Sequence, residues 1–179
     1  EYVAERLRGR KPGGAIIGAN IGKQKSTPLE DAAGDYEELI DVFAPLADYL
    51  AVNISSPNTP GLRRLQERGF LTALLGRVAA RRDETADRLA RRVPVLVKLA
   101  PDLDDEQLVT AVDVIAKSGL DGIIATNTTI RREGLQTPVA LVEACGAGGA
   151  EEVSAIVGHR GLQGRTGFER WPRTVRERV

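Results

Sequence analysis

Four short apolar runs, separated by stretches with helical character, constrain the fold of this chain more than any other feature. The runs that we predict to be strands span residues 15–21, 49–54, 93–100 and 122–126. The spacing of apolar side chains and the positions of capping residues predict helices over residues 35–47, 69–90 and 104–117. Continuous apolar strands that alternate with helices are typical of βαβ units in a parallel sheet. The sequence therefore predicts an α/β fold with about four βα units, roughly half of a closed (β/α)8 TIM barrel.

The chain divides into two parts by composition. Residues 1–135 carry the strand–helix pattern and are predicted to be the central part of the barrel, beginning with the end of a helix over residues 1–12. After Ile130 the pattern is lost, and no clear strand follows. Residues 136–179 are rich in Gly and Arg, so we expect a divergent, poorly ordered tail. Because the chain begins at Glu1 and has no Met, we also expect it to be part of a longer sequence.

Charge and residue counts exclude several classes of function. Lys and Arg number 25, as do Asp and Glu, so the formal net charge is zero and a general nucleic-acid binder is not expected. Cys145 and His159 are the single cysteine and histidine, which argues against a disulfide framework, a metal site and a Ser-His-Asp triad. No uncharged apolar run reaches the roughly 18 residues of a membrane span. The mixed charges at residues 81–88 predict a solvated helix face.

Polar residues follow each predicted strand. They are Asn20, the stretch Asn53–Leu62, Lys98, and Thr126–Thr128. The stretch after the second strand holds two Asn, two Ser and a Thr before Gly61, and its two prolines prevent a continuing strand or helix. The carboxyl ends of parallel strands lie at one edge of the sheet, where ligands bind in α/β folds. We therefore expect one site that these residues share.

The chemistry of these strand ends leaves alternatives open. Lys98 is either a lysine whose ammonium reaches water, an amine that forms a Schiff base, or a fixed positive charge beside a cofactor that becomes anionic on reduction. The last is favoured by Asn53, Asn58 and Asn127, whose amides suit a flat ligand edged with N–H and C=O groups. Ser56 has no histidine nearby in sequence. It would act as a base only in a shielded pocket, with proton removal coupled to departure of a hydride.

Four motifs in order resemble the dihydroorotate dehydrogenase family. They span residues 17–25, 53–62, 97–102 and 121–129, and the resemblance covers residues 1 to about 135. Ser56 stands where the soluble class of the family has Cys, which indicates the class 2, quinone-reducing branch. The resemblance implies an FMN-binding barrel that oxidises dihydroorotate to orotate in de novo pyrimidine (UMP) biosynthesis. It also implies a membrane quinone as final acceptor and a peripheral location at the cytoplasmic face of the cell membrane, through N-terminal helices that this chain lacks.

The resemblance assigns roles to individual residues. Ser56 would take the C5 proton while a hydride passes from C6 to the flavin N5. The implied substrate ligands are Asn53, Asn58, Asn127 and Thr128. The implied FMN contacts are Asn20, Asn53, Lys98 and Thr126. No metal is implied.

One departure from the family pattern leaves alternative functions open. A Gly-Gly-Leu-Ser-Gly turn follows the fourth strand in the family, whereas the nearest match here is displaced to residues 160–164. The alternatives are a Schiff-base lyase or aldolase-type barrel that uses Lys98, and a non-catalytic truncated remnant. An open half-barrel would leave two apolar sheet edges unpaired.

Overall fold

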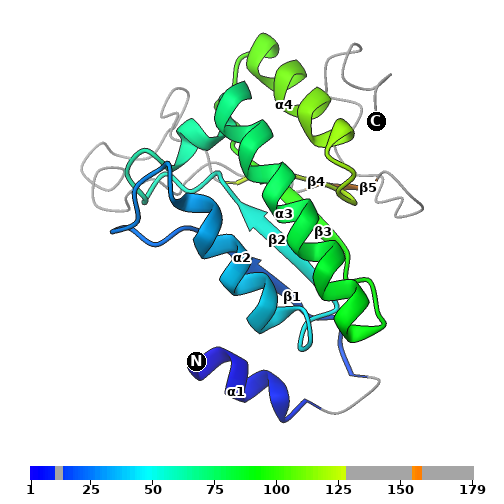
Figure 1. The fold of residues 1–179 in the computed structure, drawn as a ribbon. Helices are drawn as coiled ribbons and strands as arrows, with labels where there is room; N and C mark the ends of the chain where they lie inside the picture. Colours follow the sequence, from blue (N-terminus) through cyan, green and yellow to red (C-terminus); the bar gives the residue numbers. More distant parts are fainter. Residues whose placement is uncertain (11–13, 128–154, 159–179) are drawn as a thin grey trace, which may run out of the picture.

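A sheet with helices packed on one face forms the body of the structure (Figure 1). The structure, a computed structural model, describes residues 1–10, 14–127 and 155–158. Neighbouring strands follow chain order: β1 (Gly18–Ile21), β2 (Tyr49–Asn53), β3 (Val95–Leu99), β4 (Gly122–Ala125) and β5 (Ala155–Gly158). The pairs from β1 to β4 are parallel, and β5 pairs antiparallel with β4. The four predicted strands are therefore present, in one parallel sheet.

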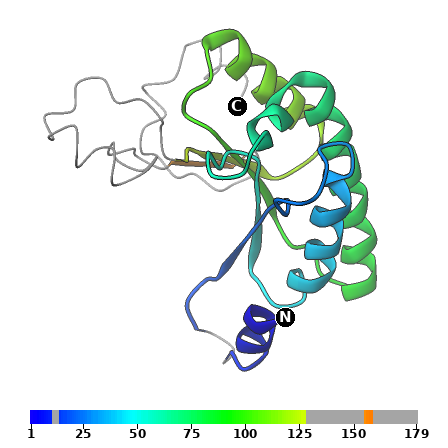
Figure 2. The same cartoon turned by 90° about the vertical axis from the view of Figure 1, so that its left-hand side faces the viewer.

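Helices alternate with the parallel strands, as the sequence pattern predicts. They are α1 (Tyr2–Arg8), α2 (Ala32–Phe43), α3 (Arg68–Leu89) and α4 (Asp105–Lys117), with the 3-10 helix η1 (Leu62–Gln66) between β2 and α3. Figure 2 shows α2, α3 and α4 together on one side of the sheet. Tyr36 and Ile40 of α2, and Leu75 of α3, have no exposed surface and pack in one core cluster with the strands. Burial of this apolar face holds the helices on the sheet.

The register of the sheet decides which side chains face away from the helices. Val52 pairs with Val97, and both belong to the core beneath the helices. One position further on, Asn53 pairs with Lys98. Because successive side chains of a strand point to opposite faces, Asn53 and Lys98 lie on the face away from the helices. Asn20 lies on that face too, since the residue after it in β1 belongs to the core.

Helix α4 begins and ends where its capping residues predict. Asp104 accepts a hydrogen bond from the Gln107 backbone N–H at 2.8 Å, and the Gln107 side chain accepts one from the Asp104 N–H at 3.1 Å. This reciprocal pair is a capping box with Asp104 as the N-cap. Gly119, after the last turn, has a φ of +75°, which glycine adopts at little cost.

Several boundaries differ from the sequence prediction. Helix α2 begins at Ala32 and ends at Phe43, three to four residues earlier than predicted, because the predicted range was read from apolar spacing alone. Strand β5 lies where the sequence shows no clear strand, so that expectation is wrong for residues 155–158. Its pairing is with the edge of β4, which its own short apolar run does not reveal. The rest of the predicted tail lies outside the described residues.

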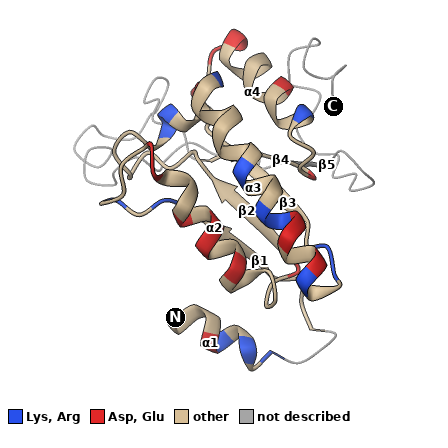
Figure 3. Ribbon diagram, in the orientation of Figure 1, with Lys and Arg blue, Asp and Glu red and all other residues tan. Residues whose placement is uncertain are grey.

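Positive and negative residues are mixed along the second half of α3 (Figure 3), but only part of this charged segment is exposed. Exposed Arg77 and Arg88 form ion pairs with carboxylates of α2. Arg82 is different, because its side chain is only 7% exposed and donates to the Gly119 carbonyl at 2.9 Å and to Asp121 at 3.4 Å. The prediction of a solvated face is therefore wrong for Arg82, which pairs with the adjacent Asp83 and also binds two partners 37 and 39 positions further along the chain.

Candidate functional site

The predicted site residues lie at one edge of the sheet, past or near the carboxyl ends of the parallel strands. Asn20 is exposed in β1, Asn53 ends β2, and Lys98 is the next-to-last residue of β3. Thr126 and Asn127 follow β4, and the Asn127 N–H donates to the Leu99 carbonyl at 3.0 Å. This bond continues the β3–β4 ladder and keeps Asn127 beside the end of β3. Thr128 lies outside the described residues.

Two of the predicted asparagines meet through Ser55. The Ser55 hydroxyl donates to Asn53 Oδ1 at 2.8 Å and accepts from Asn127 Nδ2 at 3.0 Å. The Ser55 backbone N–H also donates to Asn53 Oδ1, at 3.2 Å. Ser55 has no exposed surface, whereas both asparagines are half-buried. The arrangement fixes two amides from different strands at a common site, as a flat polar ligand requires.

Ser56, the predicted base, is half-buried in the turn after β2. Its Oγ accepts a hydrogen bond from the Asn58 backbone N–H at 3.2 Å. This local bond closes a turn and holds the hydroxyl on the same segment as Ser55. Asn58 itself is exposed, so the structure connects it to Ser56 through the backbone and leaves its amide at the surface.

Lys98 brings a positive charge to the same edge. It is half-buried and lies beside Asn53 in the β2–β3 register. Among the residues that the structure describes, no carboxylate forms an ion pair with it. A lysine on an inner sheet face whose charge is not neutralised by a neighbouring acid is suited to attract an anionic ligand group.

Tyr36 of α2 supports this edge from the helix layer. Its hydroxyl donates to the Asn53 carbonyl at 2.9 Å and accepts a hydrogen bond from the Lys23 backbone N–H. The side chain has no exposed surface, and this burial raises the pKa of the hydroxyl above its ordinary value, so it stays a donor. One phenol therefore links the loop after β1 to the end of β2.

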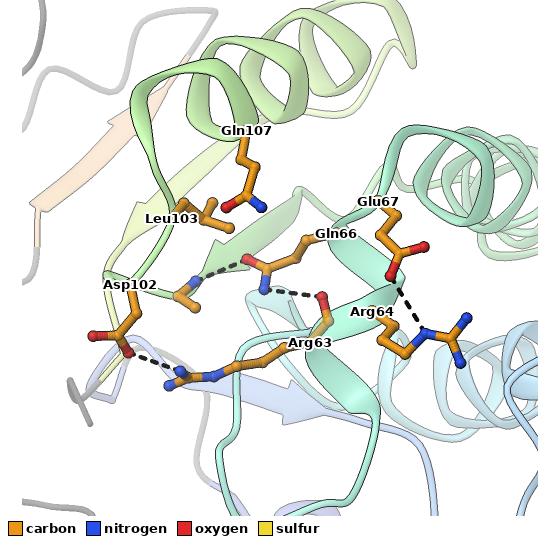
Figure 4. Close-up of a pocket in the computed structure, with 8 residues that line it drawn as sticks. Arg63, Arg64, Gln66, Glu67, Asp102, Leu103 and Gln107 are labelled. Carbon is orange, nitrogen blue, oxygen red and sulfur yellow. Dashed lines mark hydrogen bonds and ion pairs between the residues drawn. The ribbon is translucent and has the colours of Figure 1, made fainter. Parts of the chain in front are cut away.

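A cavity of about 280 Å³ opens between η1 and the loop after β3 (Figure 4). Its lining includes Arg63, Arg64, Gln66, Glu67, Asp102 and Gln107. Arg63 donates to the Ser55 carbonyl at 3.1 Å and pairs with Asp102 at 2.7 Å. Gln66 accepts from the Ala100 N–H at 3.0 Å and donates to the Arg63 carbonyl at 3.3 Å. These bonds join η1 to the end of β3.

Sequence reasoning missed Ser55, Tyr36, Arg63 and Asp102. One signal was available for the last two, since opposite charges follow shortly after the ends of two neighbouring strands. A signal for Tyr36 was also present, because a tyrosine on the apolar face of a helix needs a partner for its hydroxyl. Ser55 carried no such signal, since its neighbour Ser56 has the same side chain.

Comparison with known proteins identifies the family. The family model described as dihydroorotate dehydrogenase matches residues 1–154. A dihydroorotate dehydrogenase (quinone) of Kocuria rhizophila is 57% identical over 136 residues, which cover 75% of this chain and 37% of that protein. One from Streptomyces coelicolor is 53% identical over 154 residues, with 83% and 41% covered. The chain spans about two fifths of the length of these curated relatives.

Solved structures agree with the sequence match. The crystal structure of DHODH from Eimeria tenella in complex with ferulenol superposes with a TM-score of 0.64 at 36% identity, covering 78% of this chain and 39% of that one. The ligand-free type from the same organism gives a TM-score of 0.67 at 35% identity, covering 77% and 43%. These neighbours are TIM barrels, so the prediction of a partial (β/α)8 barrel is confirmed. The chain belongs to the dihydroorotate dehydrogenase family, in its quinone-type class 2 branch.

Proposed function

We propose that the chain forms part of an enzyme that oxidises dihydroorotate to orotate in de novo pyrimidine biosynthesis, with FMN as the first acceptor and a quinone as the final one. The observation that carries this proposal is the Asn53–Ser55–Asn127 network beside Lys98 and Ser56. It offers paired amides, a hydroxyl and a cation at one edge of a barrel sheet. The family match favours a dehydrogenase over a Schiff-base lyase that would use Lys98.

The amides would bind the substrate. Dihydroorotate has a ring edged with N–H and C=O groups, and each asparagine side chain supplies donors and an acceptor. Asn53 and Asn127 are the two that the Ser55 hydroxyl holds in fixed orientation, so they would bind the ring with little loss of side-chain freedom. Asn58 and Thr128 complete the proposed substrate set.

The residues present also fit a flavin. FMN, when bound, supplies a two-electron acceptor for the hydrogen that leaves the substrate. Lys98 would balance the negative charge of the reduced ring, since no carboxylate among the described residues neutralises it. Asn20 and Asn53 lie on the same sheet face as Lys98 and, together with Thr126, make up the proposed cofactor set.

Ser56 would remove the C5 proton. The chain has a single histidine, His159, outside the described residues, so no neighbouring imidazole is assigned to activate the hydroxyl. A serine is a weak base at its ordinary pKa, which means that the proton must leave as the hydrogen at C6 departs, in a site closed to water. The turn that Ser56 closes with Asn58 would hold the hydroxyl still for this step.

The quinone and the membrane location are the finer parts of this proposal. The relatives carry quinone in their names, and for this chain we infer a quinone acceptor at the cytoplasmic face of the cell membrane. In the part of the chain that the structure describes, no helix combines the length and apolar character that crossing a bilayer requires.

A titration with FMN tests the cofactor assignment on the chain itself. We expect the purified protein to be yellow and to quench FMN fluorescence at one equivalent. Lys98→Met should weaken FMN binding about tenfold or more, because an interaction with a charged group contributes ~1.5–3 kcal/mol. Lys117→Met is the matched control, since that side chain is 74% exposed on α4.

Three outcomes would count against the proposal. Colourless protein that takes up no added FMN would show that this chain cannot act alone. That result is the one expected of a non-catalytic truncated remnant. Equal FMN affinity of the two lysine variants would remove Lys98 from the cofactor set. An adduct trapped on Lys98 by borohydride with a carbonyl substrate would favour the lyase instead.

A further inference from the structure

We propose that Arg63 is a positioning residue that holds the Ser55–Ser56 segment against the carboxyl end of β3, and so sets the orientation of the substrate-binding amides. The inference rests on the proposed function for its meaning in catalysis. It does not concern a group that touches substrate, since Arg63 acts through Ser55. Neither the resemblance nor the sequence pattern assigns a role to this arginine.

The geometry at Arg63 joins two segments that are far apart in sequence. Its Nε donates to the Ser55 carbonyl at 3.1 Å, and its Nη1 donates to Asp102 Oδ2 at 2.7 Å. The Arg63 and Asp102 side chains are 23% and 12% exposed. A guanidinium is a rigid planar fork, so two acceptors bound to it are fixed relative to each other. The turn after β2 is therefore tied to the loop after β3.

Hydrogen bonds of Gln66 hold the backbone of η1 at Arg63. Gln66, at the other end of η1, is 5% exposed and accepts from the Ala100 N–H at 3.0 Å. Its amide nitrogen donates to the Arg63 carbonyl at 3.3 Å (Figure 4). Gln66 thus binds both the residue just after β3 and the Arg63 carbonyl, which fixes the backbone from which the Arg63 side chain extends. That side chain then has little freedom to release the Ser55 carbonyl.

The orientation of the Ser55 carbonyl affects several residues of the site. The plane of the peptide that follows it sets the direction in which Ser56 leaves the segment. The Ser55 hydroxyl meanwhile contacts Asn53 and Asn127. A rotation of this one residue would therefore displace the base and both amides together. Arg63 opposes that rotation because it holds the Ser55 carbonyl.

Arg64 provides a matched control on the same short helix. It is exposed, its guanidinium lies 5.5 Å from the centre of the Phe70 ring, and its ion pair is with Glu67 at 3.3 Å, with both charged side chains more than half exposed. An ion pair of this kind has little influence on structure. Arg64→Met therefore changes the same charge and the same side-chain length as Arg63→Met, without touching the Ser55 segment.

The experiment compares Arg63→Met, Arg63→Lys and Arg64→Met in the full chain. Hydrogen–deuterium exchange over residues 53–61 reports on the segment, and calorimetric titration with orotate reports on binding. For Arg63→Met we expect faster exchange there, unchanged exchange in α3 and α4, and about tenfold weaker orotate binding. Arg63→Lys should recover part of the exchange protection and part of the orotate affinity, since an ammonium retains the charge but not the planar donor geometry of a guanidinium. Arg64→Met should match the wild type in both.

Unchanged exchange over residues 53–61 in Arg63→Met would overturn the proposal. So would faster exchange with orotate binding that equals the wild type. If the wild-type chain binds no orotate, the proposed function fails, and the exchange rates alone decide whether Arg63 holds the segment. Should Arg63→Met lose protection throughout the chain, Asp102→Asn replaces it; local loss of protection there supports the tie, and none refutes it.

Discussion

Two adjacent serines are expected to respond to alanine substitution in opposite ways. Ser55→Ala should lower the free energy of unfolding, whereas Ser56→Ala should leave it almost unchanged and abolish turnover instead. The reason lies in burial and partners. The Ser55 hydroxyl has no exposed surface and bonds to Asn53 and Asn127. The Ser56 hydroxyl is half-buried and accepts one bond, from the backbone of exposed Asn58.

The magnitude follows from the hydrogen bonds that each change removes. An intramolecular hydrogen bond contributes a net ~1 kcal/mol, so the loss of two at Ser55 should cost about 2 kcal/mol. The carbonyl that Arg63 contacts is retained in Ser55→Ala, so that contact adds nothing to the cost. Water replaces the single partner of the Ser56 hydroxyl, and the cost there should stay below about 0.5 kcal/mol.

Urea denaturation followed by far-ultraviolet circular dichroism measures both variants against the wild type. The two unfolding free energies should differ by about 1.5 kcal/mol or more, at equal denaturant slopes. Orotate affinity adds an independent readout, because Ser55→Ala removes the hydroxyl that contacts both amides, whereas Ser56→Ala retains it. Equal stability of the two variants would refute the reasoning, since it would mean that the buried network contributes nothing.

Two further predictions concern charged groups distant from the site. Asp121→Ala should destabilise the chain by about 3 kcal/mol, because it removes one of the two carboxylates paired with the buried Arg82 guanidinium, the partner of Arg92 and the acceptor of the Val95 N–H. Asp113→Ala, in surface pairs, should cost under ~1 kcal/mol. Urea unfolding of both variants tests this, and equal costs would contradict it. The Ile17 N–H, followed by Arg10, lowers the pKa of Asp48 below its ordinary 3.8. The ionised Asp48 carboxylate thus stabilises the fold above pH 3.8, and this stabilisation is lost as the pH falls through the lowered pKa. Asp48→Asn should therefore lose less stability than the wild type between about pH 5 and about pH 3, and a parallel loss would rule this out.

The strands and their common edge could be predicted because the relevant signals are local. An apolar run identifies each strand. Parallel topology then brings Asn20, Asn53, Lys98 and the residues after Ala125 to the same edge of the sheet. The Asp104 cap was equally local, since its capping box spans three positions. For such features the sequence contains both partners within one element or one turn.

Contacts between distant segments could not be predicted in the same way. Asn127 meets Ser55 across 72 positions, and Arg63 meets Asp102 across 39. Which of many compatible polar residues pair depends on the depth and tilt of the helices, which residue spacing does not specify. Arg82 shows the resulting error, because a solvated face was predicted and a buried side chain was found.

Tyr36 connects the helix layer directly to the candidate site through its hydroxyl. It stands in the packed interface between α2 and the sheet, and its hydroxyl ends on the carbonyl of Asn53. A sideways displacement of α2 by part of an ångström would be transmitted through this rigid ring to the last residue of β2. Substitutions in the α2–α3 contact, well away from any ligand, should therefore alter ligand affinity, and inherited variation there would tune the enzyme without changing a single residue that binds.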